Sequence, residues 1–507
     1  MRARATLALA VFLTGEVAAS PRVETDGGLV FVFGDDDVLH SSGEAVPISP
    51  SAGIGDRDAY RLPFDGYGSP DTGRENRIDI TLSSAAPGYV TGLETSAALK
   101  LSIDLQQLTR GGSDSAAVFR DEGSRIDLSL HLRDGAVLGA TLFPIDTNWF
   151  RLGFVDELAW GGTRSSRDES IFPGTEGGVP GGKLYFTRRR MHAFVGLKTA
   201  ALSEVAPGGL RLPETNWGFL GGLRLEAGSW LRAEAEGGYF EQGRLEQAGV
   251  EGRLAYSAGA SGRVILRSGR ELPSVPDFFA GAPARIPGEH FFVWGRARTR
   301  GFALAIESSA LVQRLQDFEA LETTELQPAR AFAVYGSADN DALEVRLGGF
   351  YREPSFVLRN APSFPRFTTL PEALAQAPEL SLSLGATLRP ARSLWIPSID
   401  LGLRWPATLT TQGALDQFGQ RILRTLVVSG PNRLTPLEPG AGTVPVLQAR
   451  LSLLLTASRQ LSMLGWLMYR RDYNATRIEL DAEGFARGRR FVAPDFAGGG
   501  LAVRAGF

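Results

Sequence analysis

The feature that most constrains this chain is a period-two alternation of apolar and polar residues that recurs from about residue 89 to residue 507. It is clearest where Leu99, Leu101 and Ile103 alternate with Lys100 and Ser102. Successive side chains of a β-strand point to opposite faces, so this stretch predicts a strand with one apolar and one polar face. The alternating run from Tyr89 is longer than the usual strand of about 5 to 6 residues. A tilted strand that crosses a bilayer has this length.

The same pattern predicts eighteen strands. They lie near 125–133, 136–143, 149–160, 183–189, 191–201, 215–226, 229–241, 246–257, 258–268, 289–299, 300–313, 328–338, 342–352, 378–389, 394–405, 444–457, 459–473 and 496–507. The stretch from Tyr89 would be a nineteenth, and Ile78, Ile80 and Leu82 suggest a twentieth. Since single-chain bacterial barrels have even strand counts, we expect an all-β fold, a transmembrane antiparallel up-and-down β-barrel of about eighteen strands (sixteen to twenty) over 85–507.

The lengths of the connections support a barrel independently of the alternation. Short connections at 457–459, 389–393 and 338–341 alternate with long, Pro- and Gly-rich ones at 406–443, 353–377 and 161–182. Short periplasmic turns and long outer loops are typical of outer-membrane barrels. A β-propeller or a soluble sandwich has no reason to show this asymmetry.

The last eleven residues, AGGGLAVRAGF, form an alternating strand that ends on Phe507. They resemble the carboxyl-terminal assembly signal of Gram-negative outer-membrane barrels. The resemblance implies that this strand closes the barrel and that the barrel-assembly machinery reads Phe507. It also implies that the chain lies in the outer membrane, in contact with its lipid and lipopolysaccharide.

The amino terminus has the pattern of a secretory signal peptide at 1–19. Arg2 and Arg4 precede an apolar run from Ala5 to Leu13, and small residues favour cleavage after Ala19. The run is about half of the roughly 20 residues that a spanning helix needs. We therefore expect export through a cleaved signal peptide, with any membrane crossing made by strands.

Residues 20–84 form an acidic segment with many Gly, Pro and Ser residues. One interpretation is a periplasmic extension or a plug, in which Asp35, Asp36 and Asp37 hold a Ca²⁺ ion through clustered carboxylates. The other is a solvated leader, because no stretch has the spacing of an EF-hand. No other cofactor is expected.

In lipid, the charged faces of the strands must point inward, so the lumen is expected to be wet and lined by mixed Arg and Glu. The candidate lumen-lining residues are Arg224, Arg232, Glu234, Glu236, Glu251, Arg253, Arg296, Glu344, Arg346 and Arg450. A hairpin near Gly243 would place Glu234 opposite Arg253. The aromatic residues expected at the membrane interfaces are Trp149, Trp160, Trp395, Trp405 and Tyr469.

The sequence does not favour an enzyme. Cysteine is absent, the four histidines are scattered over unrelated segments, and no nucleophile elbow, zinc-protease or phosphate-loop motif occurs. The net charge of −3 gives no electrostatic case for nucleic acid.

Two functions remain open for a porin-like barrel. The leading hypothesis is a diffusion or substrate-selective channel for small hydrophilic solutes, because sixteen to eighteen strands leave an aqueous channel. No loop stands out as one that folds inside as a constriction. The alternative is a non-conducting or gated part of a polysaccharide-secretion or surface-motility machine, which acts by binding envelope protein partners. The sequence specifies neither the solute nor the oligomeric state.

Overall fold

The structure is a computed structural model. It describes residues 24–35, 37–39, 74–88, 90–105, 108, 118–155, 157–162, 178–205, 211–245, 249–269, 300–360, 368–390, 394–415, 421–430, 433–458, 460–480 and 486–506. The predicted signal peptide, Asp36, Arg296 and Phe507 lie outside these residues.

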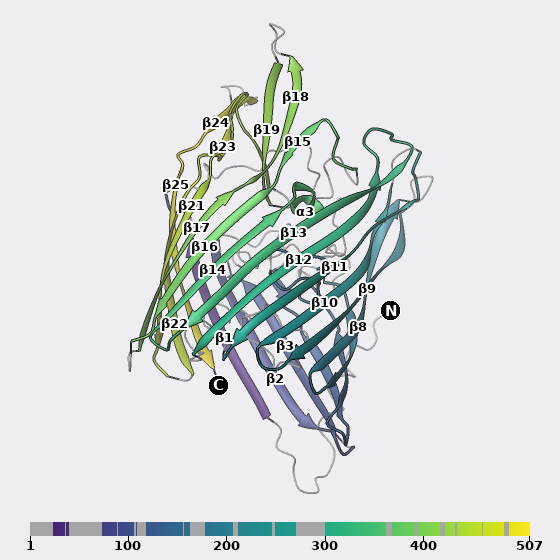
Figure 1. Cartoon of the computed structure of the whole chain (residues 1–507), viewed down its shortest axis with the longest axis vertical. Helices are drawn as coiled ribbons and strands as arrows, with labels where there is room; N and C mark the ends of the chain where they lie inside the picture. The colour runs from purple at the N-terminus through teal and green to yellow at the C-terminus, as the bar shows by residue number, and fades with distance from the viewer. Residues whose placement is uncertain are drawn as a thin grey trace.

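Antiparallel strands form a closed ring around a central lumen (Figure 1). The main sheet contains 19 strands, and β4 (Phe119–Asp121) pairs only with β3, so the ring has eighteen. In ring order they are β1 (Glu24–Asp35), β2 (Arg74–Pro87), β3 (Leu93–Asp104), β5 (Arg125–His131), β6 (Val137–Phe143), β7 (Gly181–Arg188), β8 (Met191–Val205), β9 (Arg211–Ala227), β10 (Leu231–Arg244), β11 (Leu254–Ser268), β12 (Gly301–Gln316), β13 (Thr324–Asp339), β14 (Leu343–Arg352), β16 (Glu379–Leu388), β17 (Trp395–Trp405), β21 (Val446–Thr456), β22 (Leu461–Arg471) and β25 (Asp495–Gly506). β25 pairs with β1 and closes the ring, which confirms the predicted fold class.

Although the strand count matches, the membership of the ring differs from the prediction. β1 and most of β2 lie in the stretch predicted as an extension or plug at 20–84, so that boundary is wrong. The two additional strands suggested by Ile78, Ile80 and Leu82 and by the stretch from Tyr89 are confirmed as β2 and β3. Residues 149–160 are not a ring strand, and the two strands predicted at 246–257 and 258–268 are one strand, β11. The predicted strand 289–299 lies outside the described residues, and β11 pairs directly with β12.

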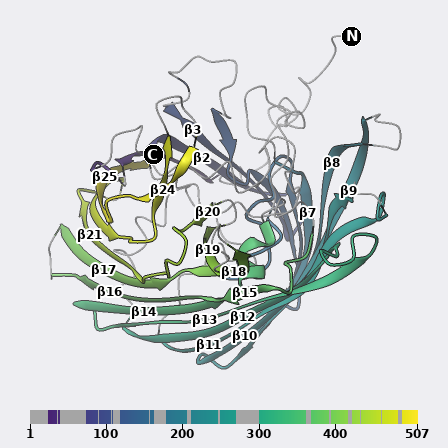
Figure 2. The same cartoon turned by 90° about the horizontal axis from the view of Figure 1, so that it is seen from above.

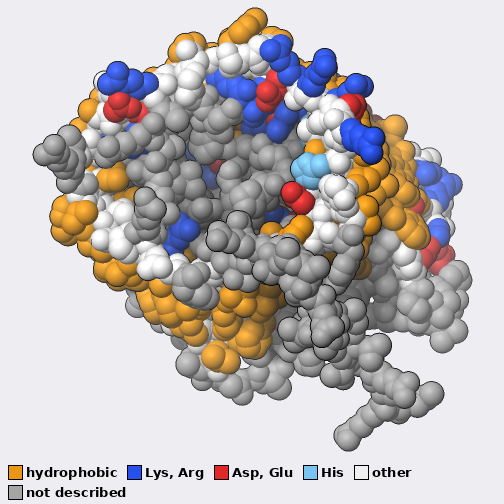
Figure 3. All heavy atoms as spheres, turned by 90° about the horizontal axis from the view of Figure 1, so that it is seen from below, with side chains coloured by type: hydrophobic (Ala, Val, Ile, Leu, Met, Phe, Trp, Pro, Cys, Tyr) orange, Lys and Arg blue, Asp and Glu red, His pale blue; other side chains and the backbone are white. Residues whose placement is uncertain are grey.

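The outer wall of the ring is apolar. Leu382, Leu451 and Leu467 are 57%, 54% and 66% exposed, on faces that alternate with inward polar residues. Trp395 and Trp405 are exposed at opposite ends of β17, where interfacial aromatic residues are expected. Seen from below, apolar side chains cover the outer wall and charged side chains gather at the rim (Figure 3).

The two ends of the ring differ. At one end, short turns of residues 189–190, 228–230 and 340–342 join β7 to β8, β9 to β10 and β13 to β14. The connection 269–300 is the exception at this end, since it joins β11 to β12. Among the described residues, no helix is long and apolar enough to cross a membrane.

Longer connections at the opposite end carry further elements. These are helix α3 (Pro354–Val357), the 3₁₀ turn η3 (Leu358–Asn360), a sheet of β15 (Leu374–Ala377), β18 (Ala407–Leu415), β19 (Arg421–Gly430) and β20 (Arg433–Pro436), and a hairpin of β23 (Thr476–Leu480) and β24 (Ala486–Phe491). Seen from above, β19 and β20 lie over the opening of the ring (Figure 2).

Two glycines shape the seam where the ring closes. Gly500 on β25 pairs with Trp466 on β22 and with Gly34 on β1, so the three inward positions form one row. The Trp466 ring covers this row: a Cβ on Gly500 would lie 2.2 Å from its Cζ2 atom, and one on Gly34 would lie 2.9 Å from it. The buried Trp466 ring therefore packs directly on the backbone of Gly500 and Gly34, and so connects β22 and β25 with β1.

We expect Gly500→Val to destabilise the closed barrel by about 1 to 3 kcal/mol, because the added side chain overpacks the seam. Unfolding by urea in lipid vesicles measures the change. Gly465→Val is the control, since its Cβ would meet no atom closer than 4.0 Å. Equal losses in the two variants would contradict the role of the seam.

Leu451→Arg should cost about 2 to 4 kcal/mol if Leu451 lies near the bilayer midplane, because a charge on the lipid face is poorly solvated. Gln448→Arg places the same side chain on the lumen face of β21 and should cost much less. The free energies of unfolding in vesicles test the assignment of the two faces. A similar cost for both would mean that this strand is placed in the wrong register.

Candidate functional site

The connection between β6 and β7 folds into the lumen. Its residues 144–162, here called the lumen segment, bring Phe150, Leu152, Phe154 and Trp160 into a buried cluster with inward-facing wall residues that include Phe240. Leu152 and Trp160 form an antiparallel bridge, and each backbone N–H donates to the other's carbonyl at 2.9 Å. The lumen segment narrows the barrel from inside.

This placement corrects three predictions. The stretch 149–160 is not a membrane strand, no interfacial role is left for Trp149 and Trp160, and a loop does enter the lumen. Trp160 is 1% exposed and donates from Nε1 to Ser261 Oγ at 2.9 Å. Trp149 donates from Nε1 to Glu122 Oε2 at 3.0 Å. The alternating apolar residues face other protein atoms, and alternation alone does not distinguish that surface from lipid.

Wall carboxylates hold the tip of the lumen segment. Glu236 on β10 accepts the Gly153 N–H at 3.0 Å. Glu307 on β12 accepts the N–H groups of Phe154 and Val155 at 2.8 and 3.3 Å. Gly153 has a φ of +88°, so the turn requires a residue without a Cβ. These hydrogen bonds satisfy backbone N–H groups that no strand pairs, and they anchor the tip of the lumen segment to the wall.

Basic residues hold the rest of the lumen segment. Lys198 Nζ on β8 donates to the carbonyl oxygens of Thr147 and Gly161 at 3.1 and 2.6 Å, which ties the two ends of the segment together. On β14, the Arg352 guanidinium donates to the Glu157 carbonyl at 3.1 Å, and Arg359 of η3 donates to a neighbouring carbonyl, that of Ala159. The segment is therefore fixed to several strands between β8 and β14.

Beside the lumen segment, a row of alternating charges crosses four strands. Arg224, Glu234, Arg263 and Glu307 occupy paired positions on β9, β10, β11 and β12. Glu234 accepts from Arg224 Nε at 2.9 Å and from Arg263 Nε at 2.6 Å. Tyr335 accepts from Arg263 and donates to Glu307, both at 3.1 Å. Each charge has an opposite neighbour, as buried charges require.

The predicted lumen residues of this half divide into two groups. Arg224, Glu234 and Glu236 are inward and buried against the filled part of the lumen, and Arg232 is inward and pairs with Glu226 at 2.8 Å. Glu251 and Arg253, in contrast, lie in the turn between β10 and β11 and are exposed.

The predicted pair of Glu234 with Arg253 is therefore wrong. β10 continues to Arg244 with a bulge between Glu241 and Gly243, so the turn comes later than a hairpin near Gly243 would place it. Asp35 and Asp37 end up at the long-loop end of β1, where the Asp37 N–H donates to Asp35 Oδ1 at 3.0 Å. Among the described residues, no group of three or more His, Asp or Glu could hold a metal, and a Ca²⁺ site that includes Asp36 remains a prediction.

The opposite half of the lumen contains an open cavity of about 490 Å³ between the lumen segment and the wall from β13 to β22. A second row crosses it, because Arg346, Gly385, Asp400 and Arg450 occupy paired positions on β14, β16, β17 and β21. Arg346 reaches over Gly385 and donates to Asp400 Oδ1 at 2.8 Å. A Cβ on Gly385 would lie 2.2 Å from that oxygen, so the glycine makes the ion pair sterically possible.

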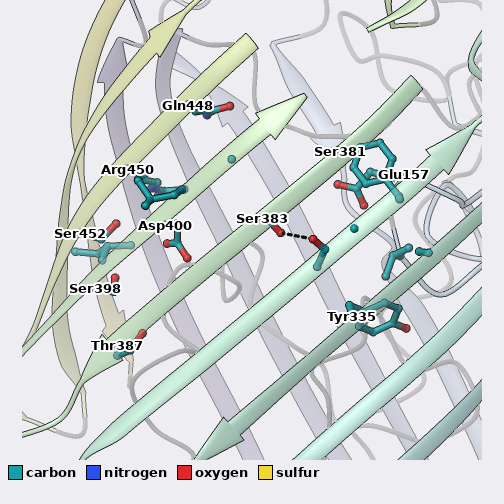
Figure 4. A pocket seen from close by; sticks show the side chains of 18 of the residues that line it. Glu157, Tyr335, Ser381, Ser383, Thr387, Ser398, Asp400, Gln448, Arg450 and Ser452 are labelled. Carbon is teal, nitrogen blue, oxygen red and sulfur yellow. Dashed lines mark hydrogen bonds between the residues drawn. The ribbon is translucent and has the colours of Figure 1, made fainter. Parts of the chain in front are cut away.

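Figure 4 shows Asp400 and Arg450 on neighbouring strands of this wall, with Ser398 and Ser452 below them. Of the predicted lumen residues, Arg450 lines the cavity and Arg346 borders it, whereas Glu344 is buried in an ion pair with Arg389. Lys198, Glu307 and Asp400 were not among the predicted residues. Glu307 and Asp400 could have been found from the alternation of their strands, since both occupy positions on the polar face. No local sequence pattern links Lys198 to residues 147 and 161.

A closed antiparallel ring, with an apolar outer wall, interfacial aromatics and a charged lumen, defines a transmembrane β-barrel of the outer-membrane type. It belongs to the larger barrels, whose lumen is wide enough to hold a folded segment and still leave a cavity.

Several solved outer-membrane proteins are similar to this chain. OccK1 (OpdK) of Pseudomonas aeruginosa has a TM-score of 0.43 and 9% identity, over 96% of this chain and 98% of that one. OccAB1 of Acinetobacter baumannii has a TM-score of 0.42 and 8% identity, over 95% and 96% of the two chains. OmpT, an outer membrane protein of Vibrio cholerae, has a TM-score of 0.35 and 8% identity, over 96% and 97%. The sequence matches no protein-family model and no curated protein.

Replacing residues 149–160 by a short Gly-Ser linker should increase single-channel conductance severalfold, because the lumen segment fills one half of the lumen. Conductance of the refolded variant in a planar bilayer is the measurement. The control removes residues 476–491, the β23–β24 hairpin beyond the ring. If the two deletions change conductance equally, the lumen segment does not narrow the conducting path.

Proposed function

We propose that this protein is an outer-membrane channel for small hydrophilic solutes, in which the lumen segment narrows the passage to the polar cavity between itself and the β13–β22 wall. The observation that carries the proposal is this cavity inside a ring of eighteen strands, whose lining combines hydroxyl, amide and charged groups with apolar side chains. A barrel of this size can enclose an aqueous channel. A polar path of this kind supplies the hydrogen bonds that a solute loses when it leaves bulk water.

The arrangement of charges supports a selective passage. In the half of the lumen that contains the lumen segment, the carboxylates and guanidinium groups bind the segment or pair with one another. In the open half, the Asp400 side chain is 38% exposed while it pairs with Arg346. The charges that a passing solute meets are therefore those around Asp400 and that of Glu157, and the buried row around Glu234 acts mainly on the structure.

The direct test is single-channel recording of the refolded protein in planar bilayers. We expect stepwise ionic conductance. A correctly folded protein without any conductance would refute the channel.

Asp400→Asn should shift the reversal potential in a salt gradient toward anion preference, because it removes a negative charge from the open path. The shift should be largest at low salt, where screening is weakest. Glu234→Gln is the matched control and should change selectivity much less, since Glu234 is 4% exposed and lies between two arginines. A larger shift for Glu234→Gln would place the conducting path in the other half of the lumen.

A further inference from the structure

Hydroxyl groups follow one another along the open wall of the lumen. β16 presents Ser381, Ser383 and Thr387 on its inward face, Thr387 pairs with Ser398 on β17, and Ser398 pairs with Ser452 on β21. These five residues are here called the hydroxyl track. At about 3.4 Å per residue, the part on β16 extends over roughly 20 Å of the wall.

Four of these five hydroxyls are available to a solute; the fifth, Thr387, is 1% exposed and its Oγ1 accepts from Arg346 Nη1 at 2.6 Å. Within the described part of the chain, no side-chain hydrogen bond involves Ser381, Ser398 or Ser452. Ser383 Oγ lies 3.4 Å from the Gly348 carbonyl oxygen, a long distance for an O–H donor (Figure 4). Each hydroxyl can both donate and accept, so the track can exchange hydrogen bonds with a molecule that does the same.

The charges around the track cancel. Asp400 and Glu157 contribute two carboxylates to the cavity, and Arg450 and the neighbouring Arg346 contribute two guanidinium groups. When Arg346, which pairs with Asp400 from beside the cavity, is counted, these formal charges sum to zero and favour neither an anion nor a cation. The charged groups can still form strong hydrogen bonds with the hydroxyls of a neutral solute.

Apolar groups complete the cavity. Phe350 on β14 is paired with Ser381, so an aromatic ring lies next to the hydroxyl track. Ile396, Leu454 and Leu464 line its short-turn side, and Val155 of the lumen segment lines the face opposite the wall. The volume of about 490 Å³ lies within the range of roughly 300 to 1,000 Å³ that is usual for sites of small ligands. A polyhydroxylated molecule matches this mixture, because it carries hydroxyl groups on a C–H framework.

We propose that this channel favours uncharged polyhydroxylated solutes of the size of a monosaccharide or sugar alcohol, which pass by exchanging hydrogen bonds along the hydroxyl track. The inference rests on the proposed channel function and names the class of solute for the same cavity.

The first experiment compares three labelled probes of similar size in proteoliposomes that contain the refolded protein. D-glucose is neutral, D-glucosamine is a cation and D-glucuronate is an anion. We expect D-glucose to enter fastest, and the ionic conductance of the same preparation is recorded in parallel. If there is no conductance, the channel and the inference both fail. If there is conductance but either charged probe enters as fast as D-glucose, the solute class is wrong and the channel stands.

The second experiment removes the hydroxyls in the variant Ser383→Ala/Ser398→Ala/Ser452→Ala. Smaller side chains widen the passage, so a purely steric lumen would pass more glucose. Lost hydrogen bonds should instead lower glucose influx by about threefold or more while ionic conductance is kept or slightly raised. Ser308→Ala, on the lipid face of β12, is the control and should have no effect.

Folding of each variant is checked by its heat-modifiable gel mobility. If the triple variant does not fold, Ser398→Ala alone is measured in the same way, with a smaller decrease expected. Glucose influx that rises together with conductance, or that stays unchanged, would overturn the role of the hydroxyl track.

Discussion

A lipid bilayer offers no hydrogen-bond partner to a backbone amide, and this constraint governs the whole molecule. A sheet in lipid must have no free edge, because each unsatisfied group costs several kcal/mol. The ring of eighteen strands has no free edge because β1 and β25, its first and last strands, pair over eight positions from Gly28 to Asp35. Trp466 lies across the two glycines of that seam, so the closure combines ladder hydrogen bonds with buried packing. The lipid also explains the apolar outer wall and the inward charges, because each strand must place its apolar face against lipid and its polar face toward the lumen.

Inside the ring, the two halves of the lumen solve different problems. The half near β8 to β12 contains the lumen segment, where aromatic packing is combined with acidic and basic side chains that each have an oppositely charged residue type or a backbone group as partner. Such pairing offsets the desolvation of buried ions, although it does not make them strongly stabilising. The half near β14 to β22 keeps a cavity because many of its inward residues are small: Ser, Thr and Gly leave space between the larger side chains such as Phe350 and Leu454.

Much of the barrel is predictable because alternation is a local signal that each strand carries by itself. It gives the faces of β9, β10 and β21 correctly, including inward Arg224, Glu234 and Arg450. It fails where the surroundings differ from lipid and water. Residues 149–160 alternate like a membrane strand but pack inside the lumen, and the acidic, Gly-rich context of β1 predicts an extension where the structure has a ring strand. These errors offset one another, so the predicted count of eighteen agrees although the set of strands does not.

The site was less predictable than the fold, since its contacts join distant parts of the chain. Glu307 binds residues 154 and 155, and Lys198 joins residues 147 and 161. No local pattern encodes such pairs. The pair of Arg346 with Asp400 depends on Gly385 between them, and in the sequence a glycine only weakens the alternating pattern of a strand.

The pairing of β1 with β25 also decides when this protein can finish folding. The two strands are separated by almost the entire sequence, so their contact is among the least local that the chain makes, and such contacts form slowly. Until it forms, the growing sheet has two open edges, each able to pair with another chain. A chain that lacks either end has no partner for the remaining edge and stays vulnerable to aggregation. The seam therefore makes folding depend on both ends of the barrel: only a chain that contains both β1 and β25 can close the ring and leave no unpaired strand edge.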